Sequence, residues 1–478
     1  HPVIDSDGHV LEFRPAVREL FAEEAGRDLL PAFDMMLDVW AIAKRMDADA
    51  LRNAGLFRMT WWGFPAANTL DRATTMLPRL LHERLDELGL DFAVLYPTYG
   101  LGAMGVDDEA VRIASVRAYN RYYAETTSGL GDRLASAAVI PMHTPQEACR
   151  ELEYAVRELG FKAAVLAGHV RRPLPPNAGA SAADVPRGAV WLDTFGLDSP
   201  HDYDPVWAKC IELGIAPTFH SAGMGWGTRT SLSSYVFNHL GNFAAAGEAI
   251  CRALFLGGVP RRFPELRCAF LEGGVGWAAN LYSDLLGHWE KRGAQHIHHY
   301  DPNRIDRDRM RELFAKYADP RSLGRSGELD AALGLLSDPE EDPARLDEFG
   351  ACGIERPEDI RDLFTERLHF GCEADEPMNA RALYKRANTH GARLKAVFSS
   401  DIGHWDVPDM RDVLGEAWEL VDEGHLDEAD FRAFTFDNPL SLWCGANPRF
   451  FEGTRIADAV RAAWPAAGAT ADAGAEPA

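Results

Sequence analysis

Short apolar runs alternate with longer amphipathic stretches along almost the whole chain. The runs are rich in the residues typical of buried strands, and the stretches between them have the apolar spacing of helices. Because alternating strands and helices form a parallel sheet, eight repeats predict a closed (β/α)8 barrel of the TIM type. An open doubly wound sheet is the alternative. The eight runs lie in residues 2–9, 91–100, 134–142, 161–168, 215–223, 266–274, 368–377 and 395–404.

Three connections between the predicted elements are too long for simple loops. They are insertions at about 10–75, 168–203 and 291–366, after strands 1, 4 and 6. The third is acidic and partly helical, and we expect it to pack on the outside of the barrel. Residues 466–478 are low in complexity, and we expect them to be disordered. The predicted organisation is therefore a single barrel over residues 1–465.

Composition narrows the choice of partners. The chain has 478 residues, 46% of them hydrophobic, with 12 Trp and 24 Phe, which indicates a large core. Its formal charge of -24 argues against nucleic acid, since phosphate binding needs a basic surface. No apolar stretch approaches the roughly 20 residues of a membrane span, so no membrane is expected. The 7 Cys form no C-x-x-C pair, which is typical of reduced thiols, and we expect a cytoplasmic protein.

Acidic and imidazole side chains stand where the apolar runs end. Asp5, Asp7 and His9 occupy alternate positions of the first strand, so we expect them to share one face. A solvent-exposed edge is one interpretation, and a metal site is the other. In a barrel the strand ends meet at one face, where a shared cation offsets the cost of burying charge. The later strands favour the metal site, because they end in His220, Glu272, Glu373 and Asp401, with His404 shortly after.

Several segments resemble those of a known family. They are "PTFHSAG" at strand 5, "LEGGVGW" after strand 6, "FSSDIGHWD" at strand 8 and "FDNPLSLW" near the end. With the strand 1 motif they resemble the amidohydrolase superfamily, and more narrowly the amidohydrolase-related branch that includes metal-dependent decarboxylases of aromatic and dienoic acids. The resemblance implies a (β/α)8 barrel with one divalent metal or two, held by Asp7, His9, His220 and Asp401.

The chain departs from the family pattern in its ligand set. It has an Asp7-x-His9 pair where many members have His-x-His, and Glu272 where many have a histidine. Lys162 lies at the beginning of strand 4, so the carboxylated lysine that bridges two metals in other members is not expected. A site rich in carboxylate ligands suits Fe, Zn or Mn with bound water better than it suits a zinc ion coordinated mainly by nitrogen. The sequence leaves two alternatives, a single metal ion or a pair of ions bridged by Glu272 or Glu373.

Side chains around the expected site are candidates for substrate binding. The insertion after strand 1 carries Trp61 and Trp62, which either cover a hydrophobic substrate as a lid or pack on the barrel. Tyr96 and Tyr99 follow strand 2, where they hydrogen-bond to substrate or pack. His169 follows strand 4 and either holds a substrate carboxylate or lies in a solvated loop.

Two functions fit these expectations, and we favour the first. In the first, which the family implies, a metal-activated water or a metal-polarised substrate serves the hydrolysis or decarboxylation of a small cyclic or unsaturated carboxylic acid. Asp401 takes up a proton, Glu272 relays one, and His220 and His404 stabilise negative charge. In the second, a nonheme di-iron pair hydroxylates an apolar, terpenoid-like substrate with O2, as in a monooxygenase branch that this carboxylate-rich site resembles. Either function needs a small-molecule substrate. The oligomeric state is undecided by the sequence, and a homodimer is one alternative.

Overall fold

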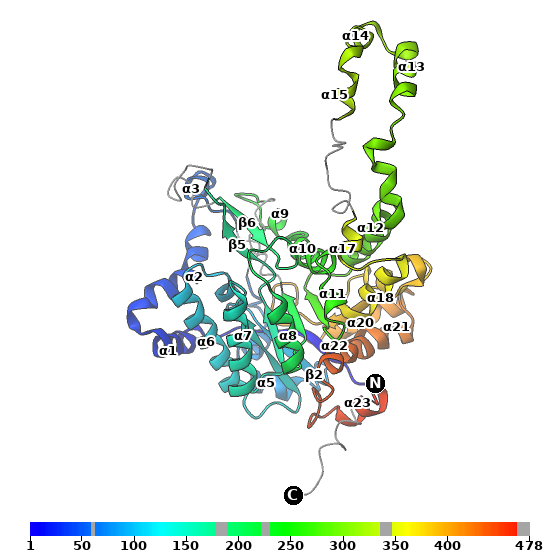
Figure 1. The fold of residues 1–478 in the computed structure, drawn as a ribbon. Helices are drawn as coiled ribbons and strands as arrows, with labels where there is room; N and C mark the ends of the chain where they lie inside the picture. The colour runs from blue at the N-terminus through cyan, green and yellow to red at the C-terminus, as the bar shows by residue number, and fades with distance from the viewer. Residues whose placement is uncertain (59–62, 177–188, 221–229, 335–346, 466–478) are drawn as a thin grey trace, which may run out of the picture.

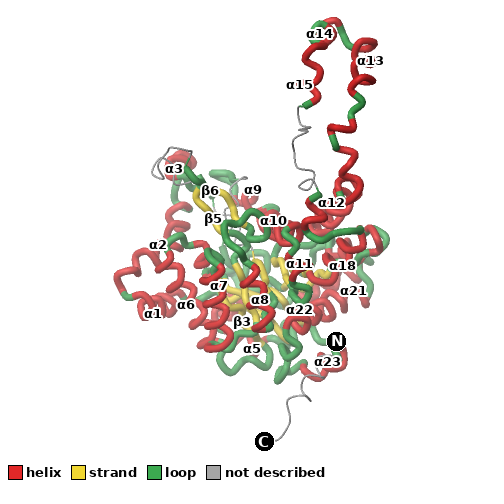
Figure 2. The backbone as a smooth tube through the Cα atoms, viewed as in Figure 1, coloured by secondary structure: helices red, strands yellow, loops and turns green. Residues whose placement is uncertain are grey.

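The predicted barrel is present in the structure, a computed structural model that describes residues 1–58, 63–176, 189–220, 230–334 and 347–465. Eight parallel strands form one sheet in the order β1-β2-β3-β4-β7-β8-β9-β10, with helices around it (Figures 1 and 2). Each predicted apolar run contributes one strand to the barrel. The strands are β1 (Ile4–Val10), β2 (Phe92–Pro97), β3 (Leu134–Ile140), β4 (Ala163–Leu166), β7 (Pro217–His220), β8 (Cys268–Leu271), β9 (Leu368–Glu373) and β10 (Lys395–Ser399).

Helices cover the barrel and build its long connections. The start of α7 shows how the sequence sets their ends: Thr144 Oγ1 accepts a hydrogen bond from the Glu147 N–H at 3.2 Å, and Pro145 occupies the first turn. None of the helices in the described ranges has the length and apolar character needed to cross a membrane. The helices are α1 (Arg14–Ala25), α2 (Leu30–Ala43), α3 (Ala48–Ala54), α4 (Thr69–Met76), α5 (Pro78–Arg84), α6 (Glu109–Thr126), α7 (Pro145–Glu153), α8 (Asp204–Leu213), α9 (Tyr235–His239), α10 (Asn242–Leu256), α11 (Val259–Arg262), α12 (Gly276–Arg292), α13 (Arg307–Tyr317), α14 (Pro320–Leu323), α15 (Leu329–Leu333), α17 (Glu348–Ala351), α18 (Pro357–Arg367), α19 (Asn379–Leu383), α20 (Val413–Asp422), α21 (Glu428–Arg432), α22 (Asn438–Ala446) and α23 (Ala457–Ala463).

Aromatic rings fill the layer between the strands and the helices. Phe219, Phe270 and Phe370 lie on the neighbouring strands β7, β8 and β9 and stack at centroid distances of 5.5 and 6.0 Å. Phe364 of α18 stacks on Phe370 at 5.6 Å, and Trp277 of α12 meets Phe270 edge-on at 5.9 Å. Burying rings of this size contributes strongly to stability, so this layer fixes three adjacent strands whose ends carry candidate site residues.

The first and last strands close the barrel at their carboxyl ends. The Asp401 N–H donates to the Asp7 carbonyl at 3.0 Å, and the His9 N–H donates to the Ile402 carbonyl at 3.2 Å. These bonds join segments from opposite ends of the chain. Closure therefore places Asp7, His9 and Asp401 side by side.

A β-bulge in β1 changes which of its side chains share a face. The register with β2 shifts between Asp5 and Gly8, so β1 holds one extra residue there. The face expected to be shared by all three side chains is therefore wrong for Asp5, because an extra residue rotates the earlier part of the strand. It is confirmed for Asp7 and His9, which belong to one group of ligand atoms. Asp5 instead accepts hydrogen bonds from the Ser400 N–H at 2.9 Å and the Ser400 hydroxyl at 2.5 Å.

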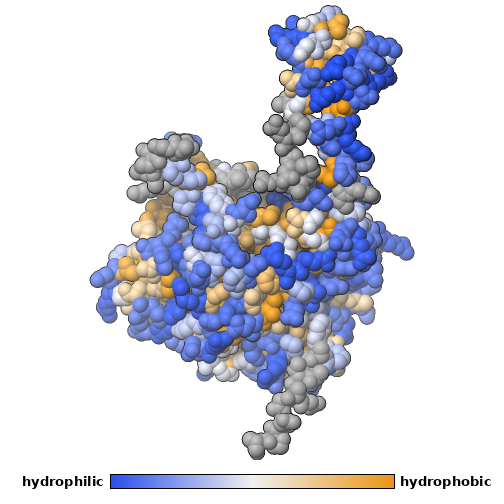
Figure 3. Space-filling model, in the orientation of Figure 1, coloured by the Kyte–Doolittle hydropathy of each residue, from blue (hydrophilic) through white to orange (hydrophobic). Residues whose placement is uncertain are grey.

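The long connections differ in shape. The one after β4 contains an antiparallel pair, β5 (Val170–Pro173) and β6 (Val190–Asp193). The one after β8 extends α12 into an arm of α13, α14 and α15 that projects away from the barrel (Figure 1), and polar residues cover most of it (Figure 3). The expectation that this insertion packs on the barrel exterior is wrong for 293–334, because α13 is mostly charged and buries no residue. The tail at 466–478 lies outside the described residues.

His143, which follows β3, makes the fold sensitive to acid. Burial, with Arg112 and Arg172 adding to it, lowers the pKa of this imidazole from 6.5 to about 3. The unfolded chain therefore binds a proton that the folded chain does not, so this contribution to stability is present above about pH 6.5 and is lost as the pH falls toward 3. We expect His143→Gln to flatten the fall in melting temperature between about pH 7 and about pH 5. Equal slopes for wild type and variant would contradict this expectation.

Candidate metal centre

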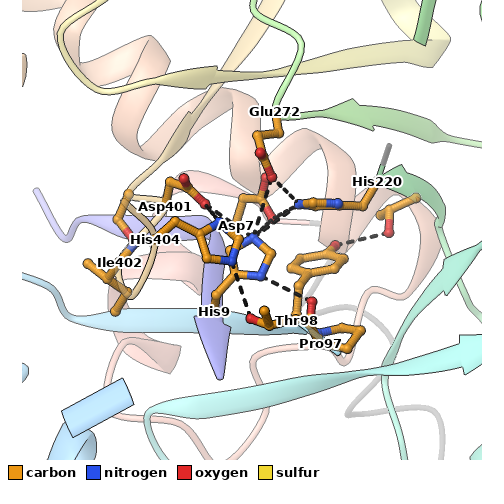
Figure 4. Close-up of polar contacts among 12 residues, drawn as sticks. Asp7, His9, Pro97, Thr98, His220, Glu272, Asp401, Ile402 and His404 are labelled. Atoms are coloured by element: carbon orange, nitrogen blue, oxygen red, sulfur yellow. Dashed lines mark hydrogen bonds and ion pairs between the residues drawn. The ribbon is translucent and has the colours of Figure 1, made fainter. Parts of the chain in front are cut away.

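Side chains from four strand ends converge at the carboxyl end of the barrel (Figure 4). All of them come from positions that the apolar pattern marks as strand ends, and nearly all are fully buried. Segments far apart in sequence thus meet at one point. The converging residues are Asp7 and His9 of β1, His220 at the end of β7, Glu272 after β8, and Asp401 and His404 after β10.

The ligand atoms of these residues fall into two overlapping groups. Within each group of four, all ligand atoms lie within 4.8 Å of one another. His9 and Glu272 belong to both groups, so the arrangement suits one metal or two with Glu272 between them. The first group is Asp7, His9, His220 and Glu272, and the second is His9, Glu272, Asp401 and His404.

Short distances connect the nitrogen and oxygen atoms of the cluster. His9 Nε2 lies 3.0 Å from His220 Nε2, 3.3 Å from Asp401 Oδ1 and 3.6 Å from Asp7 Oδ1. Glu272 Oε2 lies 2.6 Å from His220 Nε2 and 3.8 Å from His9 Nε2. Bonds of about 2.0–2.2 Å to a shared metal place neighbouring ligand atoms roughly 3–3.5 Å apart. The observed spacing is close to that requirement.

Burial makes the charged forms of these side chains energetically unfavourable unless a cation is bound beside the carboxylates. Both carboxylate oxygens of Asp7 are buried and have no hydrogen-bond partner among the described residues. Burial raises the pKa of Asp7 and of Asp401 well above the usual range for aspartate. Burial also lowers the pKa of His9, and the charges of His404 and His220 lower it further. A divalent cation offsets the carboxylate charge and binds neutral imidazole, so these residues fit a divalent metal.

His220 and Glu272 form a charged pair inside this cluster. Burial opposes the charge on both groups, yet the carboxylates of Glu272 and Asp7 raise the pKa of His220 above its usual value. The pKa of Glu272 is lowered, because the attraction of His220 outweighs the effect of burial. Each member of the pair therefore favours the charged form of the other.

The loop after β2 orients two of the histidines. His9 Nδ1 donates to the Pro97 carbonyl at 3.2 Å, which leaves the Nε2 lone pair directed at the cluster. Thr98 Oγ1 lies 3.2 Å from His404 Nε2, while His404 Nδ1 lies 2.6 Å from Asp401 Oδ1. Ligand histidines in metal sites are commonly oriented by such contacts to the second ring nitrogen.

Glu272 and Asp401 both have a left-handed backbone, with φ of 56° and 47°. Residues other than glycine rarely adopt this conformation, which costs about 1–3 kcal/mol and is concentrated at functional sites. In both cases the turn ends a strand and directs the carboxylate toward His9 (Figure 4). The backbone strain is thus coupled to the placement of the two carboxylates.

Other predicted site residues lie around the cluster. Glu373 ends β9 and belongs to neither ligand group, and burial together with Asp406 and Glu272 raises the pKa of its carboxyl to about 8. Tyr96 is fully buried, and its hydroxyl donates to Thr218 Oγ1 at 3.0 Å. The Tyr96 ring therefore supports the imidazoles from within the barrel.

The predicted substrate contacts lie farther out. Tyr99 packs edge-on against Phe64 of the strand 1 insertion, with ring centroids 5.9 Å apart. His169 follows β4 and is half-buried, and burial is the main cause that lowers its pKa to about 4. Trp61 and Trp62 lie outside the described residues.

Two acidic residues of the site are absent from the prediction. After burial, the charge of Asp406 is the largest cause that raises the pKa of the Asp401 carboxyl. Asp406 is the last residue of the quoted segment "FSSDIGHWD", so the sequence indicated its place near the site. Glu12 is buried and accepts hydrogen bonds from three consecutive backbone N–H groups of the loop after β2, at 3.1, 2.9 and 2.9 Å. It thereby holds the loop that positions Thr98, a role that no sequence pattern reveals.

The candidate metal ligands lie at the carboxyl end of the barrel strands, where (β/α)8 enzymes have their active sites. The amidohydrolase family model matches residues 90–319, which is slightly less than half of the chain. This match confirms the predicted resemblance to the amidohydrolase superfamily.

Solved structures with a similar fold include three decarboxylases. One is a 2,6-dihydroxybenzoate decarboxylase from Rhizobium, with 14% identity, 93% of this chain and 98% of that chain covered, and a TM-score of 0.48. Another is a 5-carboxyvanillate decarboxylase from Sphingomonas paucimobilis, with 14% identity, coverage of 92% and 98%, and a TM-score of 0.49. The third, a dihydroxybenzoic acid decarboxylase from Polaromonas with bound manganese, has 15% identity, coverage of 93% and 97%, and a TM-score of 0.45. With identities of 14–15% and TM-scores below 0.5, these likenesses assign neither a substrate nor a metal to this chain.

Proposed function

We propose that the protein uses a divalent metal to hydrolyse or decarboxylate a small cyclic or unsaturated carboxylic acid. The observation that carries this proposal is the buried cluster at the barrel mouth, in which the Asp7 carboxylate has no hydrogen-bond donor among the described residues. Such a carboxylate is stable when a cation shares its charge. The amidohydrolase match over residues 90–319 supports the same class of chemistry.

Each residue of the cluster has a distinct part in this proposal. Asp7, His9, His220 and Asp401 hold the metal, which when bound acts as a Lewis acid on an oxygen of water or substrate. His404 lies against Asp401 and stabilises negative charge that develops on the substrate. Asp401 takes up a proton, and burial together with the charge of Asp406 favours that uptake because both raise the pKa of Asp401.

Metal loading followed by product analysis tests the proposal. The purified chain is stripped with a chelator, reloaded separately with Mn2+, Zn2+ or Fe2+, and incubated without O2 with a panel of aromatic and unsaturated carboxylic acids. We expect metal-dependent release of CO2 or of a hydrolysis product. If every metal-loaded form stays inactive without O2 and becomes active with it, the hydrolase or decarboxylase proposal is wrong.

A second candidate function, di-iron oxygenation of an apolar substrate, is favoured by the overlap of the two ligand groups. Glu272 belongs to both groups, and a carboxylate between two iron ions is the arrangement found in carboxylate-bridged di-iron sites. This function predicts two Fe per chain and substrate-dependent consumption of O2. One metal per chain would exclude it.

A further inference from the structure

Three cationic side chains lie at the starts of three neighbouring barrel strands. Arg267 directly precedes β8, Arg367 directly precedes β9, and Lys395 is the first residue of β10. The sheet order places these strands side by side. The metal cluster lies at the carboxyl ends of the strands, so the three cations lie at the opposite end of the barrel. We call Arg267, Arg367 and Lys395 the basic triad.

Strand pairing brings the members of the basic triad together. The first residues of β8 and β9 pair with each other, so Arg267 and Arg367 begin neighbouring strands at the same level. Lys395 pairs with the second residue of β9, and its Nζ donates to the Glu366 carbonyl at 3.4 Å. That carbonyl belongs to the peptide bond between Glu366 and Arg367. The ammonium group therefore lies next to Arg367, at the start of the middle strand of the three.

The surrounding protein leaves the charge of the basic triad largely unbalanced. Although the chain carries a formal charge of -24, the described residues give the triad one carboxylate within 4.0 Å, Glu366 Oε2, at 3.8 Å from Arg367 Nη2. Arg267 donates only long hydrogen bonds of 3.4–3.5 Å, to the carbonyls of residues 264–266. Arg367 Nε is buried and has no hydrogen-bond partner in the described part of the chain. Donors and positive charge are therefore left for a ligand.

The three cations also disfavour one another's charge. Burial and the charges of Arg267 and Arg367 lower the pKa of Lys395 to about 8, even though the Glu366 carboxylate acts in the opposite direction. Burial lowers the pKa of Arg267, and the charge of Arg367 lowers it further. The neighbouring His369 supplies no negative charge, and burial with the charges of Lys395 and Arg267 lowers its pKa well below the usual value. An anion bound between the cations would reverse this mutual repulsion.

We propose that the basic triad binds a phosphate-class oxyanion at the end of the barrel opposite to the metal cluster. All three side chains are half-buried, so an ion from solvent can reach them. The planar fork of an arginine matches two phosphate oxygens, and a lysine adds a compact charge. The ligand is inorganic phosphate or the phosphate group of an organic molecule. This site is separate from the proposed function, because its ligand does not contact the metal cluster.

Calorimetric titration of inorganic phosphate into the metal-loaded chain, at pH 8 and constant ionic strength, tests the proposal. Lys395→Gln and Arg267→Gln each remove one charge of the basic triad. The matched control is Arg393→Gln, because Arg393 is also half-buried and lies two residues before Lys395, but it pairs with Asp430 at 2.7 Å. The same titrations are repeated on the metal-stripped chain and with phenyl phosphate.

We expect phosphate to bind wild type, and Lys395→Gln and Arg267→Gln each to weaken that binding about tenfold or more. Arg393→Gln should stay within about threefold of wild type. The metal-stripped chain should bind phosphate as the metal-loaded chain does. Tighter binding of phenyl phosphate would identify an organic phosphate as the ligand, and equal or weaker binding would identify the free ion.

Proton uptake gives a second measurement that does not depend on the variants. With a pKa of about 8, Lys395 is roughly half charged at pH 8, so a bound anion should draw up to about half a proton onto it. The heat of binding should therefore depend on the ionisation enthalpy of the buffer, and this dependence should be lost in Lys395→Gln. The proposal is overturned if wild type does not bind phosphate, if it binds without proton uptake, if binding requires the metal, or if both triad variants bind as wild type does.

Discussion

Replacing His9 or His220 with alanine is expected to remove metal from the protein and to abolish its activity. Both imidazoles direct Nε2 into the cluster, 3.0 Å apart, and His9 contributes to both ligand groups. Loss of a contact that only orients a ligand weakens metal affinity roughly 10–100-fold. Loss of the ligand itself should therefore cost more than about 100-fold. Metal analysis after gel filtration, together with activity under saturating metal, measures both effects.

The barrel should survive these substitutions, because its stability comes mainly from the packed layers rather than from the mouth. His369→Ala is the matched control, since His369 is an equally buried barrel imidazole whose Nε2 lies 2.7 Å from Ser441 Oγ, away from the cluster. We expect this variant to lose stability and keep its metal. Full metal retention in both His9→Ala and His220→Ala would contradict the assignment of the cluster as a metal site.

The strands of the barrel were predictable because burial on both faces leaves a simple pattern in sequence. Each parallel strand reads as a continuous apolar run, and the polar residues at its carboxyl end stand out against that run. The ends at His220, Glu272 and Asp401 could be found in this way without any contact information. Lys162 was also placed correctly, before β4, where its amine donates to the Phe450 carbonyl at 3.2 Å.

The parts that escaped prediction depend on geometry that no local pattern encodes. The bulge in β1 is invisible in the apolar pattern, so Asp5 was assigned to the face of Asp7 and His9. The members of the basic triad stand at the starts of three different strands, and only the order of the strands brings them together. The arm after α12 could not be placed either, because a charged amphipathic segment has the same sequence pattern whether it packs on a barrel or projects from it.

The number of metals depends on two carboxylates, and their substitution by glutamine is the second decisive experiment. Glu272 belongs to both ligand groups, whereas Glu373 belongs to neither. With a pKa of about 8, Glu373 is largely uncharged near neutral pH while no cation is bound, so glutamine resembles its neutral form. We therefore expect Glu373→Gln to have a small effect on metal content, and Glu272→Gln to have a large effect on either metal content or rate.

The two proposed functions differ in what Glu272→Gln does. At a single metal, the other ligands retain the ion, and the loss of a proton-relaying carboxylate slows turnover about 100-fold or more. Two divalent cations a few ångströms apart repel strongly, so a pair needs the anion between them, and glutamine should release one ion. Metal analysis of wild type, Glu272→Gln and Glu373→Gln distinguishes these outcomes, with Glu376→Gln as a control that removes a nearby charge outside both ligand groups. One metal ion per chain in every sample would exclude the di-iron alternative. Two in wild type and one in Glu272→Gln would identify the bridging carboxylate and contradict the single-metal site.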